Sequence, residues 1–69
     1  SDEDVRNMIL RHARLLVECK GEFTGIREMR KHFAWYTAGF PNSSMLRNQV
    51  NFIESLEALE ELVKNVKKL

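Results

Sequence analysis

Apolar residues recur every three or four positions along most of this chain, which is the spacing of amphipathic helices. The first helix is expected to begin at Ser1, a good N-cap, and to stop near Lys20 at Gly21. Its expected apolar face consists of Val5, Met8, Ile9, His12, Leu15, Leu16 and Cys19. A short link over residues 21–25 is then expected, with Thr24 as the candidate N-cap of the next helix.

The stretch from Ile26 to Pro41 predicts a second helix that Gly39 and Pro41 bring to an end. Its apolar side consists of Ile26, Met29, Phe33, Tyr36 and Phe40, and its opposite side of Arg27, Lys31, Ala34 and Ala38. Arg30 flanks the apolar stripe, and Trp35 lies at one edge of the polar side. This helix therefore directs an apolar stripe to a core and a cationic strip to solvent.

Two shorter helices are expected after Pro41. Residues 42–44 offer capping side chains for a third helix of two or three turns, and Ser55 caps the last one. The last apolar stripe consists of Leu56, Leu59, Leu62, Val63, Val66 and Leu69. Four helices with short connections predict an all-α fold, a small antiparallel bundle of four helices with the third short, as a single domain over residues 1–69.

Length and composition restrict the possible classes of protein. A chain of 69 residues buries only about 60% of its unfolded surface, so a piece of a larger protein is plausible. The single Cys excludes an internal disulfide, favours a reducing compartment and leads us to expect a cytoplasmic location. The formal net charge of +1 does not indicate a class of partner, so only the distribution of charge along the chain can do so. No apolar run approaches a membrane span, so no membrane partner is expected.

The reactive side chains form no recognisable catalytic or metal site. His12 lies on an apolar face, so we interpret it as a packed core histidine. Cys19 is near the carboxyl end of a helix, where the dipole disfavours a thiolate, and is interpreted as a small core residue. Glu57, Glu60 and Glu61 precede lysines on a face that we expect to be solvated. We therefore expect no catalytic, metal-binding or cofactor-binding residue in this chain.

The cationic strip is the feature that favours a function. Arg27 and Lys31 lie one turn apart, and Trp35 follows one turn beyond Lys31. Arg30 flanks the strip, and Arg47 on the third predicted helix would extend it. Cations that follow phosphates, with an aromatic ring among them, are typical of nucleic-acid surfaces. An ordinary solvated face, with Trp35 packed in the core, is equally compatible with this spacing.

The segment Met29–Pro41, MRKHFAWYTAGFP, resembles the C-terminal helical domain of the bacterial-type tRNA-dihydrouridine synthases, which share its series of Arg-Lys-His, Trp-Tyr, Gly and Pro. The similarity continues at His12, Leu15-Leu16 and Gly21-Glu22 upstream, and at Leu46-Arg47 and Ser55-Leu56 downstream. Asn42 departs from the pattern, since a small residue such as Gly is expected after Pro41. The departure concerns only the turn that follows.

The resemblance implies that the chain is a C-terminal fragment of a larger flavoenzyme. In that family an FMN-binding (β/α)₈ barrel carries the flavin and a catalytic cysteine that protonates uracil, and a helical bundle helps to grip tRNA. Cys19 does not match that cysteine, so no cofactor is expected in this chain and FMN is expected on the absent barrel. The implied partners are tRNA and the barrel, with self-association possible through the barrel-facing surface.

By this resemblance Arg30, Lys31 and His32 are the positions that face tRNA or the cleft beside the barrel. The full set of expected tRNA-binding residues is Arg27, Arg30, Lys31, His32, Trp35 and Arg47. The alternative is a protein-interaction helical bundle without a nucleic-acid role, in which an apolar patch is the working surface. An autonomous enzyme is the least supported of the three hypotheses, because no nucleophile has a base and an orienting group.

Overall fold

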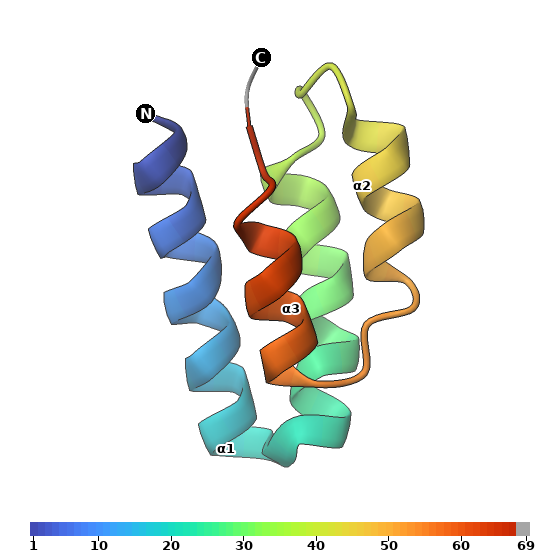
Figure 1. The fold of residues 1–69 in the computed structure, drawn as a ribbon. Helices are drawn as coiled ribbons and strands as arrows, with labels where there is room; N and C mark the ends of the chain where they lie inside the picture. Colours follow the sequence, from blue (N-terminus) through green and yellow to red (C-terminus); the bar gives the residue numbers. More distant parts are fainter. Residues whose placement is uncertain (68–69) are drawn as a thin grey trace.

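The computed structural model describes residues 1–67, and in that range it contains three helices and no strand (Figure 1). They are α1 (Asp2–Tyr36), α2 (Ser43–Val50) and α3 (Leu56–Val63). α1 folds back on itself, so that its two halves lie side by side, with α3 in front of them and α2 beside the second half (Figure 1). The prediction of an all-α fold is confirmed.

The expected bundle of four separate helices is not confirmed, because the first two predicted helices are one element. α1 has non-helical backbone angles at a single residue, Gly21, with φ 84° and ψ 164°. A side chain at such angles is strained, so glycine is the residue that permits the reversal. The helix resumes at Glu22, so the predicted link over residues 21–25 and its Thr24 cap were wrong. Residues 2–20 and 22–36 are called the first and second arms of α1 below.

A second glycine allows the two arms to approach closely. Gly25 is buried, and a Cβ built on it would lie 2.8 Å from the carbonyl oxygen of Leu16 and 2.9 Å from the Cα of Val17. Carbon atoms do not normally approach that closely, so no side chain fits at this position. The arms are therefore in backbone contact one helical turn beyond the bend.

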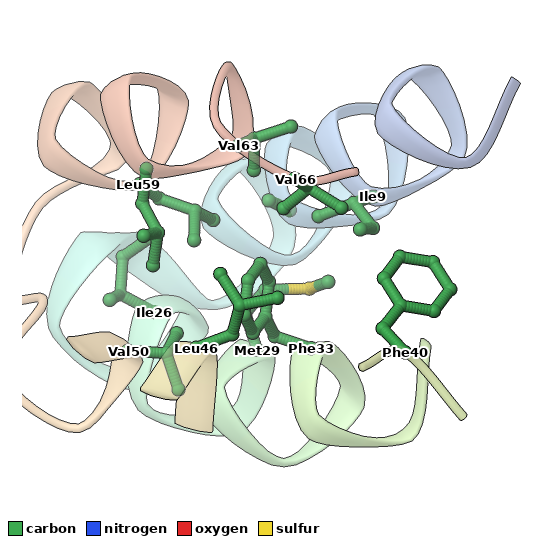
Figure 2. Close-up of a cluster of buried hydrophobic side chains, with 12 residues drawn as sticks. Ile9, Ile26, Met29, Phe33, Phe40, Leu46, Val50, Leu59, Val63 and Val66 are labelled. Carbon is green, nitrogen blue, oxygen red and sulfur yellow. The ribbon is translucent and has the colours of Figure 1, made fainter. Parts of the chain in front are cut away.

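The hydrophobic core lies between the arms, α2 and α3 (Figure 2). Its buried members are Ile9, Ala13, Ile26, Met29, Phe33, Phe40, Leu46, Val50, Leu59, Leu62, Val63 and Val66. The predicted apolar stripes of the second and last helices supply most of this set, which confirms them in outline. Leu69, which was assigned to the last stripe, lies outside the described residues.

Two long-range polar contacts join the first arm to the carboxyl-terminal part of the bundle. Arg6 Nη1 donates to the carbonyl oxygen of Val66 at 2.8 Å, and Arg14 Nη2 donates to Glu60 Oε2 at 2.9 Å. Both pairs connect residues far apart in sequence, so they fix α3 and the segment after it against the first arm. No helix within residues 1–67 is both long and apolar enough to cross a membrane.

Two of the predicted N-caps are confirmed. The Ser1 hydroxyl accepts from the Asp4 amide at 3.2 Å, and the Ser55 hydroxyl accepts from the Ala58 amide at 3.1 Å. Asn42 precedes α2 but makes no side-chain capping hydrogen bond. The eight residues of α2 agree with the expected short helix.

Candidate nucleic-acid interface

Four side chains at four-residue intervals form a ridge along the second arm. Phe23, Arg27, Lys31 and Trp35 follow one another by slightly more than one turn, so they lie on one gradually rotating line. Phe23 is 68% exposed and Trp35 is 77% exposed. We call these four residues the outer ridge. It begins near the bend of α1 and ends at the last turn of the second arm.

Arg27 is held in place by its neighbour on the outer ridge. Its guanidinium carbon lies 3.6 Å from the centroid of the Phe23 ring, and its Nη1 donates to the Phe23 carbonyl oxygen at 3.1 Å. A cation–π contact, unlike an ion pair, places no opposite charge beside the cation. Arg27 therefore remains positively charged and only partly covered.

Glu28 is the acid beside the outer ridge, and it is already paired. Lys20, from the first arm, places its Nζ 2.8 Å from Glu28 Oε2. The Lys20 hydrogen bond is the main reason that the pKa of the Glu28 carboxyl is lowered, with smaller contributions from the charges of Lys20, His32 and Lys31. One carboxylate is thus surrounded by several cations, and neither Arg27 nor Lys31 makes an ion pair within residues 1–67.

A cleft of about 300 Å³ opens between the arms beside the end of the outer ridge. It is lined by His12 from the first arm and by His32, Trp35 and Tyr36 from the second. The two imidazole rings lie 4.4 Å apart between centroids, and His12 Nδ1 is 3.2 Å from the Tyr36 hydroxyl. Trp35 meets His32 nearly at right angles, at 5.7 Å between ring centroids. We call this site the histidine–aromatic cleft.

The histidine–aromatic cleft disfavours protonation of His12. Partial burial is the main cause that lowers the pKa of this imidazole below its usual 6.5, and the charge of His32 is the second. His12 is therefore neutral near pH 7, with one ring nitrogen as donor and the other as acceptor. The part of the lining that His12 contributes is thus polar and carries no full charge.

The family of this chain follows from sequence comparison. The family model described as "Dihydrouridine synthase (Dus)" matches residues 2–69. The chain belongs to the dihydrouridine synthase family. The resemblance noted in the sequence is thereby confirmed at the level of the family.

The curated relatives of this chain are much longer than it is. It is 43% identical over 60 residues to a "Probable tRNA-dihydrouridine synthase" of Mycobacterium leprae. These aligned residues make up 87% of this chain and 16% of the relative. The chain is 38% identical over 68 residues to "tRNA-dihydrouridine synthase B" of Vibrio vulnificus, covering 93% of this chain and 21% of the relative. No solved structure matches. The chain thus corresponds to a fragment of such an enzyme.

Two of the six expected tRNA-binding residues of this chain lie apart from the others. Arg30 is half-buried, and its Nε and Nη2 donate to the carbonyl oxygen of Ile53 at 3.0 and 2.5 Å, which ties the second arm to the connection between α2 and α3. Arg47 is exposed on α2, and no hydrogen bond, ion pair or ring contact within residues 1–67 links it to the outer ridge. The structure brings Arg27, Lys31, His32 and Trp35 together along one side of the second arm.

The first arm carries an apolar surface that the sequence assigned to the core. Met8 and Leu15 are more than half exposed, and Cys19 is exposed as well, so its interpretation as a core residue was wrong. His12 is half-buried at the rim of this surface rather than packed in the core. The buried side of the arm is instead centred on Ile9 and Ala13, because α3 covers the arm from that side.

The histidine–aromatic cleft was not predicted as a unit, because its residues are far apart in the sequence. A weak signal was present: His12 falls among apolar residues, and a His, a Trp and a Tyr follow within five positions of one another on the second arm. Only the reversal at Gly21 places the two groups side by side. Within residues 1–67 no three His, Cys, Asp or Glu side chains gather in a way that could hold a metal ion.

Proposed function

We propose that this chain is the tRNA-gripping helical part of a tRNA-dihydrouridine synthase, acting beside a barrel that reduces uridine. The observation that carries the proposal is the outer ridge: Lys31 is exposed and Arg27 is partly exposed, neither makes an ion pair within residues 1–67, and the exposed ring of Trp35 follows them. The names of the relatives, which are tRNA-dihydrouridine synthases, support tRNA as the polyanion.

On this proposal the cations of the outer ridge contact tRNA phosphates, and the shape of the tRNA sets the fit. Such contacts release counter-ions, so affinity falls as salt rises. If the chain neutralises about four phosphates, binding weakens on the order of a hundredfold between about 50 and about 200 mM salt. Arg30 and Arg47 are proposed as secondary contacts, Arg30 through the part of its side chain that the Ile53 carbonyl leaves open.

We assign FMN to the barrel, as the family resemblance implies, and the histidine–aromatic cleft of this chain does not fit it. The histidine–aromatic cleft is lined by four rings, and none of the three glycines of the chain lies in its wall. A flavin phosphate needs a cradle of backbone amides or paired cations, and the cleft lining provides neither. The chain therefore contributes binding and orientation to the proposed reaction, and no chemical step is assigned to its residues.

A second candidate function is a protein-interaction bundle without a nucleic-acid role. The observation that favours it is the exposed apolar surface of the first arm, where Met8, Arg11, His12, Leu15 and Tyr36 surround a hollow of about 240 Å³. If the chain grips tRNA as proposed, this surface contacts the barrel domain, and it mediates self-association when the barrel is missing.

Charge reversal of the outer ridge separates the two functions. In the variant Arg27→Glu/Lys31→Glu we expect tRNA binding to fall, and the slope of log affinity against log salt to decrease by about two. The control is Lys64→Glu/Lys67→Glu, which changes net charge equally on two exposed lysines outside the outer ridge and the histidine–aromatic cleft.

Binding is measured by fluorescence anisotropy of labelled tRNA at about 50 and about 200 mM salt, with circular dichroism to verify the helices. A salt-independent affinity would refute the electrostatic grip. Equal loss of binding in the ridge and control variants would show that net charge, rather than the outer ridge, is responsible.

A further inference from the structure

The histidine–aromatic cleft has features that phosphate binding by the outer ridge does not require. Phosphates need cations, whereas four aromatic or imidazole rings converge here from both arms. Trp35 is 77% exposed, so most of its indole is uncovered within residues 1–67. Because its ring is nearly perpendicular to that of His32, the two rings are not stacked on each other and form two walls of a corner. An open corner of rings suits a flat ring system that can stack on one wall.

We propose that the histidine–aromatic cleft holds one unpaired nucleobase of the bound tRNA, stacked on Trp35. The inference rests on the proposed tRNA-binding function and deepens it by assigning a base-binding subsite. Unpaired bases of RNA are recognised mainly by stacking on aromatic side chains. The cleft volume of about 300 Å³ lies at the lower end of the range for drug-sized ligands, and a single base is smaller than such ligands.

The lining of the cleft offers polar groups suited to the edge of a base. His12 Nδ1 and the Tyr36 hydroxyl share a hydrogen bond of 3.2 Å, so the capacity left for a base is that of His12 Nε2 and the remaining capacity of the hydroxyl. Since His12 is neutral near pH 7, this edge pairs with the amide-like groups of a base rather than with a phosphate. Stacking on Trp35 and a hydrogen bond at this lining would both be satisfied by a base that enters between the arms.

Cations stand on both sides of the cleft, where the phosphates beside the base would lie. Lys31 is one turn before Trp35 on the second arm, and Arg11 lines the adjoining hollow next to His12 on the first arm. The charge complementarity favours a nucleotide over an uncharged aromatic ligand, and over a protein side chain without flanking negative charge. The outer ridge and the cleft would then contact one continuous strand.

The single tryptophan of the chain makes this inference directly measurable. Trp35 is the only Trp, so intrinsic fluorescence reports on the cleft alone. The 69-residue chain is titrated with a short oligouridylate and with an abasic ribose-phosphate oligomer of equal length. We expect the oligouridylate to quench Trp35, and the abasic oligomer to bind by charge with much weaker quenching.

Affinities in variants provide the second readout, by anisotropy of labelled oligomers. Trp35→Ala should weaken oligouridylate binding by about five- to a hundredfold, which corresponds to the loss of one stacked base, and should leave abasic binding unchanged. Phe52→Ala is the matched control, because Phe52 is equally exposed but lies on the connection after α2, away from the cleft. It should leave both affinities unchanged.

Three results would overturn the inference. The first is equal quenching and equal affinity for the two oligomers, with the salt dependence of tRNA binding intact; the electrostatic grip would then stand without a base subsite. The second is loss of oligouridylate affinity in Phe52→Ala to the same extent as in Trp35→Ala. The third is concentration-dependent self-association that buries Trp35 without RNA, which would make the cleft a contact between copies of the chain.

Discussion

Replacing Gly25 by alanine tests the close approach of the two arms on which the cleft depends. The added Cβ would meet backbone atoms of the first arm, 2.8 Å from the Leu16 carbonyl oxygen. Ordinary contacts begin at 3.4 Å, so the arms must separate by about 0.6 Å at this point. Backbone atoms cannot rotate away as the end of a flexible side chain can, so the strain spreads along both arms.

The size of the effect follows from two opposing contributions. Alanine favours a helix over glycine by about 0.8–1 kcal/mol, whereas inserting a methyl group into a tightly packed contact costs about 1–3 kcal/mol. The two contributions leave a net loss of about 0–2 kcal/mol in the free energy of unfolding. For Gly25→Ala we expect the upper half of that range, about 1–2 kcal/mol, since the contact is with backbone on the opposite arm. Each kcal/mol lowers the melting temperature of a domain of this size by about 4–8 °C.

The assay is thermal and urea unfolding followed by circular dichroism, with two other glycine variants as references. Gly39→Ala is the matched control, because its added Cβ meets no atom within 4 Å and its φ is not positive. Gly21→Ala also meets no atom, yet should cost about 1–3 kcal/mol because φ is 84°. If Gly25→Ala were as stable as Gly39→Ala, the backbone contact between the arms would be refuted.

Three further perturbations have defined outcomes. Arg30→Met leaves the Ile53 carbonyl unpaired and should lower the free energy of unfolding by about 1–3 kcal/mol in urea. An unchanged free energy of unfolding would contradict this, and a salt slope of tRNA binding reduced by about one would support the proposed secondary phosphate contact. Ser55→Ala removes an N-cap and should cost about 1 kcal/mol of unfolding free energy, whereas equal loss in Ser44→Ala, which removes no cap, would contradict this. Folding lowers the pKa of His12, so this imidazole binds a proton more readily in the unfolded chain than in the folded one. The free energy of unfolding is therefore at its full value above about pH 6.5 and falls as the pH drops below it. Melting temperatures from about pH 7.5 to about pH 5 should show this fall, and His12→Gln should reduce it; identical profiles would disprove it.

Much of the fold could be predicted because helix periodicity and caps are local. The face formed by Ile26, Met29 and Phe33, and the caps at Ser1 and Ser55, needed only residues within a turn or two of one another. The reversal at Gly21 was not predicted in its true form. Two glycines and a threonine between residues 21 and 25 suggested a link, and the local sequence cannot show that a single residue suffices for the turn.

The site was predicted in part for a similar reason. Periodicity identified Arg27 and Lys31 as outward-facing, and left the position of Trp35 open between surface and core. It failed for His12 and Cys19, because the apolar face of the first helix is broader than α3 and the second arm can cover. A periodic pattern shows which side chains share a direction, but how much of that direction a neighbour covers depends on the tertiary arrangement.

Because one residue makes the reversal, there is no loop between the two arms of α1 that could absorb an inserted or deleted residue. The partnership of His12 with His32 and Tyr36 is therefore fixed by the number of peptide units on either side of Gly21. Inserting one amino acid between Gly21 and His32 would swing that imidazole by about 100° around its helical axis, whereas most point substitutions there would leave it in place. Relatives that keep these rings in register are thus expected to tolerate changes of residue in this interval, except at Gly25, and no changes of length.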